Sequence, residues 1–268
     1  MDIKGFSSAM FGWNIPYWRE NKEPALEEIF RHCAEAGLHA VELDASPEKV
    51  QAAQAYGLAV SGTYIGLDLH ELFESLDIEK SILPAARRLS DAGGSDLILN
   101  ANPKGGWGNP QPKTEEEFKR QGANLARIAA AVRPYELKVC LHNHAADNHN
   151  AEGDLRSVVD YASPEVHLCV DTGWAHVAGA DPIQWIRDYP QRIAAVHLRN
   201  QIGDVPTEDI LEGEIDMPEL VRTLHTIDYR GWLCFELWHR EDTFPKRTMA
   251  EDMRRSVEAL KLWLDEIN

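Results

Sequence analysis

Four short segments in the second half of the chain share one design, and that design limits how the chain can fold. Each is built of apolar, β-branched or small residues and ends in side chains able to bind a metal; they lie at 139–144, 167–171, 195–199 and 234–236. Side chains alternate between the two faces of a strand, so residues two apart share a face. A small residue therefore lies beneath each ligand: Cys140 beneath His142, Cys169 beneath Asp171, Ala195 beneath His197 and Cys234 beneath Glu236. The pattern predicts four strands that line one funnel, with a ring of ligands at its mouth.

Segments typical of strands and helices alternate along the whole chain. We expect strands at 4–10, 39–43, 58–65, 96–100, 139–144, 166–171, 193–198 and 232–237. We expect helices at 24–36, 46–57, 78–92, 114–133, 154–161, 182–189, 217–227 and 248–267. Such alternation indicates a parallel sheet, and eight units in 268 residues favour a closed barrel. The sequence therefore predicts one domain over residues 1–268, a single (β/α)8 TIM barrel, and it lacks the Gly-x-Gly-x-x-Gly turn of a dinucleotide fold after the first strand.

Two connecting segments are rich in aromatic or turn-forming residues. The segment 11–18 holds two Trp residues and a Tyr, and we expect a loop that either forms an apolar wall over a pocket or caps one end of the barrel. The segment 102–110 is rich in Gly, Pro and Asn, which is typical of a loop. Trp107 at its tip is a candidate lid residue.

The composition disfavours several classes of function. Acidic residues outnumber basic ones by 44 to 27, which gives a formal net charge of −17, whereas binding to a nucleic-acid backbone needs clustered Lys and Arg. We therefore expect no nucleic-acid partner. The start of the chain has no basic run followed by an apolar segment, and no window approaches about 18 consecutive apolar residues. We expect no membrane partner and a cytoplasmic location.

The ends of strands five to eight carry the candidate metal ligands His142, Asp171, His197 and Glu236. In a TIM barrel the active site lies at these C-terminal strand ends. Two imidazoles and two carboxylates suit one divalent ion such as Mn, Co, Zn or Fe, and they suit calcium poorly. In the alternative interpretation each residue is an isolated polar group that bonds to a loop. Four successive strands with the same inward parity favour the metal site.

Five motifs in the same half of the chain resemble those of a known family. They are His142-Asn143-His144, Asp171-Thr172-Gly173-Trp174 with Gly179-Ala180-Asp181-Pro182, Val196-His197-Leu198-Arg199, Gly213-Glu214-Ile215-Asp216, and Gly231-Trp232-Leu233-Cys234-Phe235-Glu236. As a set they resemble the xylose-isomerase-like TIM barrel family of sugar phosphate isomerases and epimerases, which also contains tagatose epimerases, hydroxypyruvate isomerase, inosose dehydratase and endonuclease IV. The resemblance implies one divalent ion held by Glu, Asp, His and Glu on strands five to eight.

Strand five departs from this family pattern, because it presents His142 where Glu is common. Subgroups that resemble this chain carry a His-x-His motif there, so either His142 or His144 is the expected ligand. One of the two carboxylates that exchange a proton with the substrate is then missing. Glu236 remains as the expected general base, with His144 or His176 as its partner on the opposite face. A partner that returns the proton to carbon gives isomerisation or epimerisation, and one that protonates a leaving hydroxyl gives elimination.

Further residues are candidates for binding the substrate. Arg199 is expected to hold a hydroxyl, carboxylate or phosphate group, or alternatively to pair with a nearby acidic residue. Glu42 ends the second strand and is a candidate partner for sugar hydroxyls. A platform beneath a sugar ring could be formed by Trp13, Trp107 and Trp174, although aromatic core packing explains each of them nearly as well.

The favoured interpretation is a divalent-metal-dependent isomerase or epimerase that acts on a small sugar, keto-sugar or sugar phosphate through an enediolate. The first alternative is a metal-dependent lyase that dehydrates a keto-polyol or cleaves a keto-glycoside, as in inosose dehydratase. A second is a barrel that binds a sugar without turnover. A DNA-repair nuclease is disfavoured by the net charge of −17 and by a single ligand quartet. The family resemblance also implies a homo-oligomer.

Overall fold

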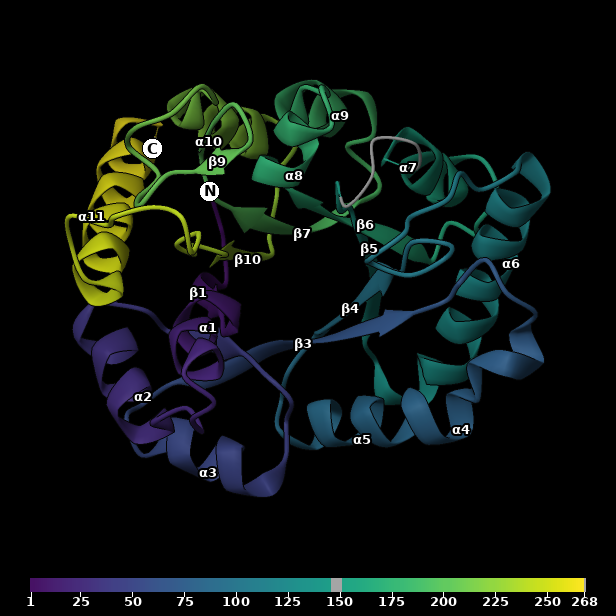
Figure 1. Cartoon of the computed structure of the whole chain (residues 1–268), viewed down its shortest axis with the longest axis horizontal. Helices are drawn as coiled ribbons and strands as arrows, with labels where there is room; N and C mark the ends of the chain where they lie inside the picture. The colour runs from purple at the N-terminus through teal and green to yellow at the C-terminus, as the bar shows by residue number, and fades with distance from the viewer. Residues whose placement is uncertain (146–150, 268) are drawn as a thin grey trace.

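Eight parallel strands close into a barrel, which confirms the expected (β/α)8 TIM barrel (Figure 1). The computed structural model describes residues 1–145 and 151–267. Around the barrel the strands follow the order β1, β10, β7, β6, β5, β4, β3 and β2. The barrel is closed because β1 pairs with both β10 and β2. Their bounds are β1 (Gly5–Ala9), β2 (Ala40–Glu42), β3 (Ala59–Leu67), β4 (Asp96–Ala101), β5 (Lys138–His142), β6 (Val166–Asp171), β7 (Ile193–Leu198) and β10 (Trp232–Phe235).

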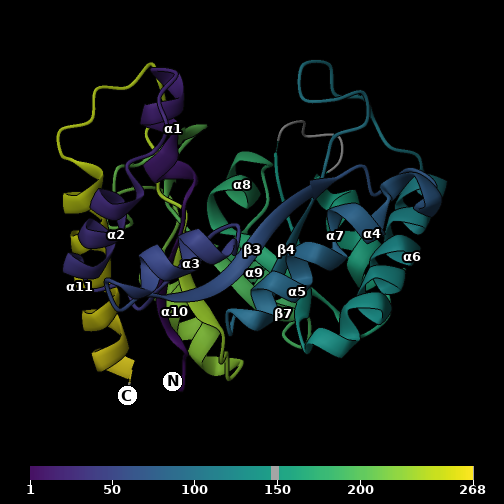
Figure 2. The ribbon, with the colours of Figure 1, turned by 90° about the horizontal axis from the view of Figure 1, so that it is seen from below.

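Helices surround the barrel and alternate with its strands (Figures 1 and 2). They are α1 (Phe11–Arg19), α2 (Leu26–Glu35), α3 (Pro47–Gln54), α4 (Ile78–Ser81), α5 (Leu83–Asp91), α6 (Glu115–Val132), α7 (Ala151–Val159), α8 (Thr172–Val177), α9 (Pro182–Asp188), α10 (Met217–Thr226) and α11 (Met249–Ile267), with 3-10 helices η1 (Phe73–Leu76) and η2 (Arg133–Tyr135). Within the described residues, no helix combines the length and the apolar character that crossing a membrane requires.

The segment 11–18 forms most of α1, so the expectation of a loop there is wrong. Pro16 lies inside this helix without an amide hydrogen to donate, and Gly12 has a low helix propensity. Tertiary packing outweighs these local preferences. Gly12 lies so close to the backbone of Leu237 that an added Cβ would come within 1.7 Å of the carbonyl oxygen. Trp13 is buried as well.

Three further features differ from the expected pattern. The helix expected at 78–92 is divided into α4 and α5, and Pro84 in the first turn of α5 explains the break because it has no amide hydrogen for the preceding turn. Two elements were not expected: α8, which directly follows β6, and an antiparallel hairpin of β8 (Gln201–Ile202) and β9 (Val205–Pro206) after β7. Both are too short for hydrophobic periodicity to indicate them.

Apolar side chains pack in two separate clusters. The larger one joins the strands to the helices that surround them. The smaller one consists of Ile98, Cys140, Cys169, Ala194 and Ala195. Three of these residues were expected beneath the ligands. Because their side chains are small, they leave space in the barrel for the longer polar side chains above them.

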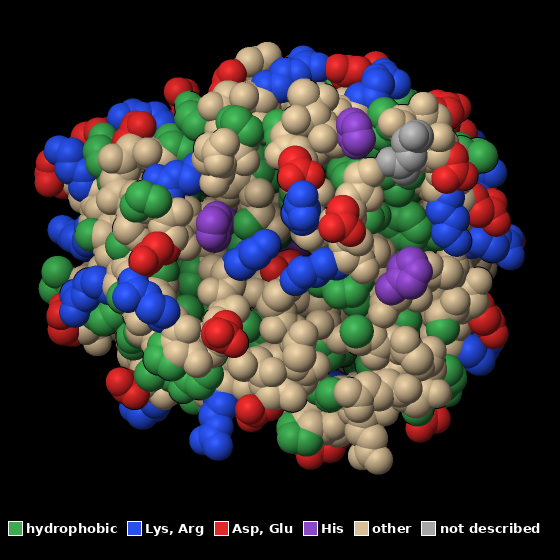
Figure 3. Space-filling view, turned by 180° about the vertical axis from the view of Figure 1, so that it is seen from behind, with side chains coloured by type: hydrophobic (Ala, Val, Ile, Leu, Met, Phe, Trp, Pro, Cys, Tyr) green, Lys and Arg blue, Asp and Glu red, His purple; other side chains and the backbone are tan. Residues whose placement is uncertain are grey.

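The two ends of the barrel differ in what covers them. In Figure 2, α1 and the loop after β4 rise at one end, whereas both termini lie at the other. The C-terminal strand ends face the first of these ends, because β1 leads into α1 and β4 leads into the loop. Figure 3 shows the molecule from behind the view of Figure 1, and charged side chains of both signs are interspersed there with apolar and uncharged ones.

Polar side chains fasten the ends of β5, β6 and β7 to one another. Asn143 brackets the backbone of Asp171: its Oδ1 accepts from the Asp171 amide at 2.8 Å, and its Nδ2 donates to the Asp171 carbonyl at 3.0 Å. Thr172 Oγ1 donates to the Arg199 carbonyl at 2.6 Å and accepts from the Arg199 amide at 3.1 Å. The Arg199 side chain then crosses Gly173, where an added Cβ would lie 2.6 Å from Nε. This close approach explains why the position is a glycine.

Gly173→Ala should therefore lower the stability of the protein. The new methyl group would collide with Cγ, Nε and Cζ of Arg199, a fully buried side chain that is held by Asp171. Overpacking of this kind lowers the free energy of unfolding by about 1–3 kcal/mol, which urea denaturation measures. Gly108→Ala is the matched control, because its added Cβ meets nothing within 4 Å. Equal unfolding midpoints for the two variants would contradict this packing account.

Candidate metal centre and active-site cavity

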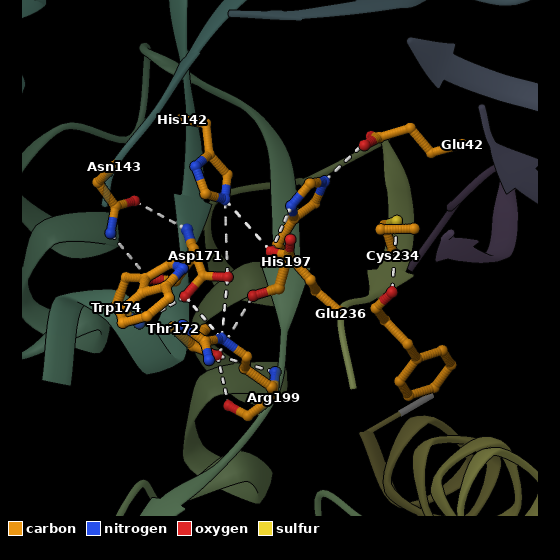
Figure 4. A network of polar contacts seen from close by, with 12 residues as sticks. Glu42, His142, Asn143, Asp171, Thr172, Trp174, His197, Arg199, Cys234 and Glu236 are labelled. Atoms are coloured by element: carbon orange, nitrogen blue, oxygen red, sulfur yellow. Dashed lines mark hydrogen bonds and ion pairs between the residues drawn. The ribbon is translucent and has the colours of Figure 1, made fainter. Parts of the chain in front are cut away.

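Four side chains from neighbouring strands converge at the mouth of the barrel. His142, Asp171, His197 and Glu236 each offer one ligand atom, and these atoms lie within 4.8 Å of one another. His142 Nε2 lies 3.3 Å from Glu236 Oε2 and 3.7 Å from Asp171 Oδ2 (Figure 4). His197 Nδ1 lies 3.0 Å from the same Glu236 oxygen. The structure thus brings together the four residues that side-chain alternation along the strands placed on the inner face. We refer to these four residues as the ligand ring.

The two histidines of the strand-five motif occupy different places. His142 ends β5 and belongs to the ligand ring. Its Nδ1 is buried and has no hydrogen-bond partner among the described residues. His144 lies beyond the strand and lines a cavity, where its ring stacks on Trp174 at a centroid distance of 4.0 Å and meets Trp107 edge-on at 4.7 Å. By position, His142 is the candidate ligand and His144 is a candidate for contact with a substrate.

Burial and hydrogen bonding shift the pKa values within the ligand ring. Burial alone would raise the pKa of Glu236, but His197 and His142 hold it well below its ordinary value. Burial alone would lower the pKa of His142, yet hydrogen bonds to Asp171 and Glu236 raise it. The pKa of His197 is also raised, because the electrostatic effect of the groups around it outweighs its burial. These shifts favour protonated imidazoles beside an unprotonated Glu236.

The donor set of the ligand ring fits a single divalent cation. Two imidazole nitrogens already face carboxylate oxygens, so a cation among them would take the place of the shared protons. Such binding competes with protonation of the ligands. Mixed nitrogen and oxygen donors suit Mn, Co, Zn or Fe. Two carboxylates also match the charge of a divalent ion.

Two charged side chains hold the ligands from outside the ring. The carboxylate of Glu42 lies 3.0 Å from His197 Nε2, while His197 Nδ1 is turned toward Glu236. Arg199 donates through Nε to both oxygens of Asp171, at 3.0 and 3.1 Å. A carboxylate on the outer nitrogen of a metal-binding histidine fixes its tautomer and ring orientation. Glu42 and Arg199 are thus placed to orient one candidate ligand each.

A cavity of about 560 Å³ opens above the ligand ring. Glu236 is the ring residue that reaches it, whereas His142, Asp171 and His197 are buried below. Aromatic side chains are prominent in the lining, and none of the described residues there is Lys or Arg: they are Ala9, Met10, Phe11, Asn14, Trp18, Glu42, Leu43, Asp44, Tyr64, Trp107, His144, Trp174, Glu236 and Trp238. Cavities of this size and character are typical of small-ligand sites.

Most residues expected to contact a substrate or to act as acid and base lie together in this cavity; they are Glu42, Trp107, His144, Trp174 and Glu236. Arg199 does not reach it. This side chain is fully buried, its guanidinium lies 4.3 Å from the ring of Trp174, and it pairs with Asp171. The structure therefore does not support the expectation that Arg199 binds substrate. It supports the alternative that Arg199 forms an ion pair with a nearby acidic residue, which is Asp171.

Trp13 and His176 lie outside the cavity, so the expectations for both are corrected. Trp13 is 5% exposed, and its indole nitrogen donates to Ser8 Oγ at 3.0 Å. His176 Nε2 lies 2.8 Å from the Glu214 carboxylate in a separate surface hollow. Both residues belong to helices that were not expected, α1 and α8. Successive helical residues point about 100° apart, so Trp174 and His176 cannot face the same cavity.

Several cavity residues were not singled out from the sequence. Phe11, Asn14 and Trp18 lie at positions i, i+3 and i+7 of α1, and residues at this spacing share one face of a helix. A helical interpretation of the segment would have identified them. Tyr64 on β3 and Trp238 after β10 carry no periodic signal of this kind.

The family and curated relatives agree with this architecture. Residues 30–264 match the family model of the xylose isomerase-like TIM barrel. The chain is 24% identical over 241 residues to the rhizopine catabolism protein MocC of Rhizobium meliloti, a match that covers 79% of this chain and 74% of that protein. It is 28% identical over 142 residues to an inosose dehydratase of Clostridium tetani, covering 46% of this chain and 48% of that enzyme. The match thus spans about half the length of that relative.

A solved structure of L-ribulose 3-epimerase shares the fold. It superimposes with a TM-score of 0.76 and 19% sequence identity, covering 98% of this chain and 95% of the other. A 3-keto-D-glucoside 4-epimerase from E. coli gives a TM-score of 0.68 at 19% identity, covering 98% and 99%. Because the family model spans most of the sequence, the chain belongs to the xylose isomerase-like TIM barrel family.

Proposed function

We propose that this chain is a divalent-metal-dependent isomerase or epimerase of a small, unphosphorylated sugar or keto-sugar. The observation that carries the proposal is the position of Glu236, whose carboxylate belongs to the ligand ring and also reaches the cavity. Enolisation of a hydroxyketone needs a group that accepts a proton close to the group that polarises the carbonyl. The similar proteins include epimerases and a dehydratase, and they support the same class of chemistry.

Glu236 would move the proton. A divalent ion held by the ligand ring would polarise the substrate carbonyl and stabilise the negative charge that develops on its oxygen. A glutamate carboxylate is unprotonated at neutral pH, so Glu236 can accept a proton from the adjacent carbon. Delivery of that proton to the neighbouring carbon gives an isomer. Delivery to the opposite face of the same carbon, by a second group, gives an epimer.

His144 would orient a hydroxyl group of the substrate. Burial, with a smaller effect of His142, lowers the pKa of His144 to about 3. The ring is therefore neutral at neutral pH, and it can donate one hydrogen bond and accept another. It does not carry the extra proton that would assist the departure of a hydroxyl group. This property favours isomerisation, in which Glu236 alone moves the proton, over elimination.

The charges in the cavity favour an unphosphorylated substrate. Glu42, Asp44 and Glu236 line it, and no Lys or Arg is among the described lining residues. Phosphate groups are usually held by Arg, Lys or backbone amides at helix N-termini. Arg199, which the sequence offered for this role, is buried and paired with Asp171. A neutral sugar avoids repulsion from the three carboxylates.

A metal-dependent lyase that removes water from a keto-polyol is the second candidate, and the match to an inosose dehydratase favours it. Both reactions would begin with the same proton transfer to Glu236, and they differ in the next step. Mass spectrometry of the product separates them. An isomer or epimer keeps the mass of the substrate, whereas dehydration removes one water molecule.

Glu236→Gln should abolish the proton transfer without abolishing sugar binding. The amide keeps the shape of the side chain and an oxygen donor, but it cannot accept the proton. We expect exchange of the proton next to the carbonyl to fall by about 10²–10⁴-fold. NMR in D2O, with manganese-loaded protein and a panel of ketoses, aldoses and keto-polyols, measures this exchange.

His176→Asn is the matched control for that experiment, because His176 pairs with Glu214 outside the cavity. It should leave the exchange rate within about twofold of the wild type, in line with surface substitutions of small effect. Wild-type exchange in Glu236→Gln, or a large loss in His176→Asn alone, would assign the proton transfer to another group.

Glu42→Gln should weaken metal binding. The substitution removes the carboxylate that faces His197 Nε2, and loss of such an orienting contact typically costs 10–100-fold in metal affinity. Competition against a chromophoric chelator measures the dissociation constant. Asp44→Asn is the control, because Asp44 also lines the cavity but pairs with Lys49 and Arg88. Equal effects of the two substitutions would show that general cavity charge, and not the orientation of His197, sets the affinity.

A further inference from the structure

A row of aromatic side chains extends across the cavity from His144 to the surface. Trp174 stacks on His144, and the centroid of Trp238 lies 6.3 Å from that of Trp174. The ring centroid of Phe11 lies 5.9 Å from that of Trp238 in a T-shaped arrangement, and the centroid of Trp18 lies 6.3 Å from that of Phe11. These separations are those of interacting aromatic rings. We call Trp238, Phe11 and Trp18 the outer aromatic wall.

The outer aromatic wall leaves apolar surface open to the cavity. Phe11 is 40% exposed and Trp18 is 50% exposed, although both line the cavity. Large aromatic side chains normally bury most of their surface, and contiguous exposed apolar patches commonly mark binding sites. Met10 and Leu43 line the same cavity and add to its apolar surface. The cavity therefore offers exposed aromatic ring surface as well as the polar groups near Glu236.

The size of the cavity exceeds what a single small sugar fills. A volume of about 560 Å³ lies within the range of roughly 300–1,000 Å³ that holds drug-sized ligands. The outer aromatic wall lines the same cavity as Glu236 and Glu42. Asn14, on the same face of α1 as Phe11 and Trp18, has a buried Oδ1 that lacks a hydrogen-bond partner among the described residues. Asn14 therefore adds a polar side chain to the cavity lining beside the outer aromatic wall.

We infer that the substrate is an uncharged keto-glycoside whose ketone-bearing sugar ring lies at Glu236 and whose aromatic aglycone lies on the outer aromatic wall. The inference rests on the proposed function for the placement of the sugar. A second sugar in place of the aglycone would need several hydrogen-bonding groups, and the polar side chains among the outer lining residues are Asn14 and Asp44. A phosphorylated or carboxylated extension would face Glu42 and Asp44, with no Lys or Arg among the described lining residues to offset their charge. A neutral aromatic group matches both the ring surfaces and the charge.

The test compares matched glycosides in binding to the manganese-loaded protein. Methyl and 2-naphthyl glycosides of glucose and galactose, as α and β anomers, are titrated by calorimetry as binding probes, because without a ketone they cannot enolise. At least one naphthyl glycoside should bind about tenfold or more tightly than its methyl counterpart, which is the affinity expected from one added aromatic stacking contact. Trp18→Ala and Trp238→Ala should each reduce this difference severalfold.

Phe244→Ala is the matched control, because Phe244 is 95% exposed and does not line the cavity. It should leave the difference between the glycosides unchanged. Equal affinities of every matched pair, no binding of any naphthyl glycoside, or an equal effect of Phe244→Ala would overturn the inference.

Proton exchange on free sugars is measured in the same preparation. It distinguishes failure of the aglycone site from failure of the proposed function. Exchange without preference for a naphthyl group would overturn the aglycone site alone. Preferential binding of a naphthyl glycoside, lost in Trp18→Ala, would support the aglycone site even if no sugar in the panel undergoes exchange.

Discussion

The barrel mouth depends on the compensation of two buried carboxylates. An isolated buried carboxylate is strongly unfavourable, so each must be paired and hydrogen-bonded. Asp171 pairs with Arg199, and Glu236 faces His142 and His197. These contacts explain why the pKa of Glu236 is lowered while those of the two histidines are raised. The same donors that share protons in this arrangement are the ones that would hold a cation.

The barrel and the ligand ring could be predicted because both follow from local rules. Eight alternations of strand and helix define the fold class, and side-chain alternation along a strand places His142, Asp171, His197 and Glu236 on the inner side. Side-chain alternation could not distinguish His142 from His144 as the candidate ligand, since both lie on the same side of an extended segment. The end of β5 at His142 separates them, because the chain leaves the strand direction there.

The remaining site residues depend on helices and long-range contacts that the sequence does not reveal. Gly12 and Pro16 argued against a helix, yet packing against the segment after β10 stabilises α1 and points Trp13 into the core. The short α8 likewise turns His176 toward Glu214. The contact between Glu42 and His197 joins residues 155 positions apart, and it becomes visible only when the barrel closes.

The central claim is that the ligand ring holds one divalent cation, and the metal content of the purified protein tests it most directly. Wild-type protein prepared without chelator or added metal should contain about one equivalent of Mn, Co, Zn or Fe. Asp171→Ala and His142→Ala should lose that metal while circular dichroism shows that both variants remain folded. A wild-type protein that carries no metal, and takes up none when Mn, Co, Zn and Fe are supplied, would contradict the account.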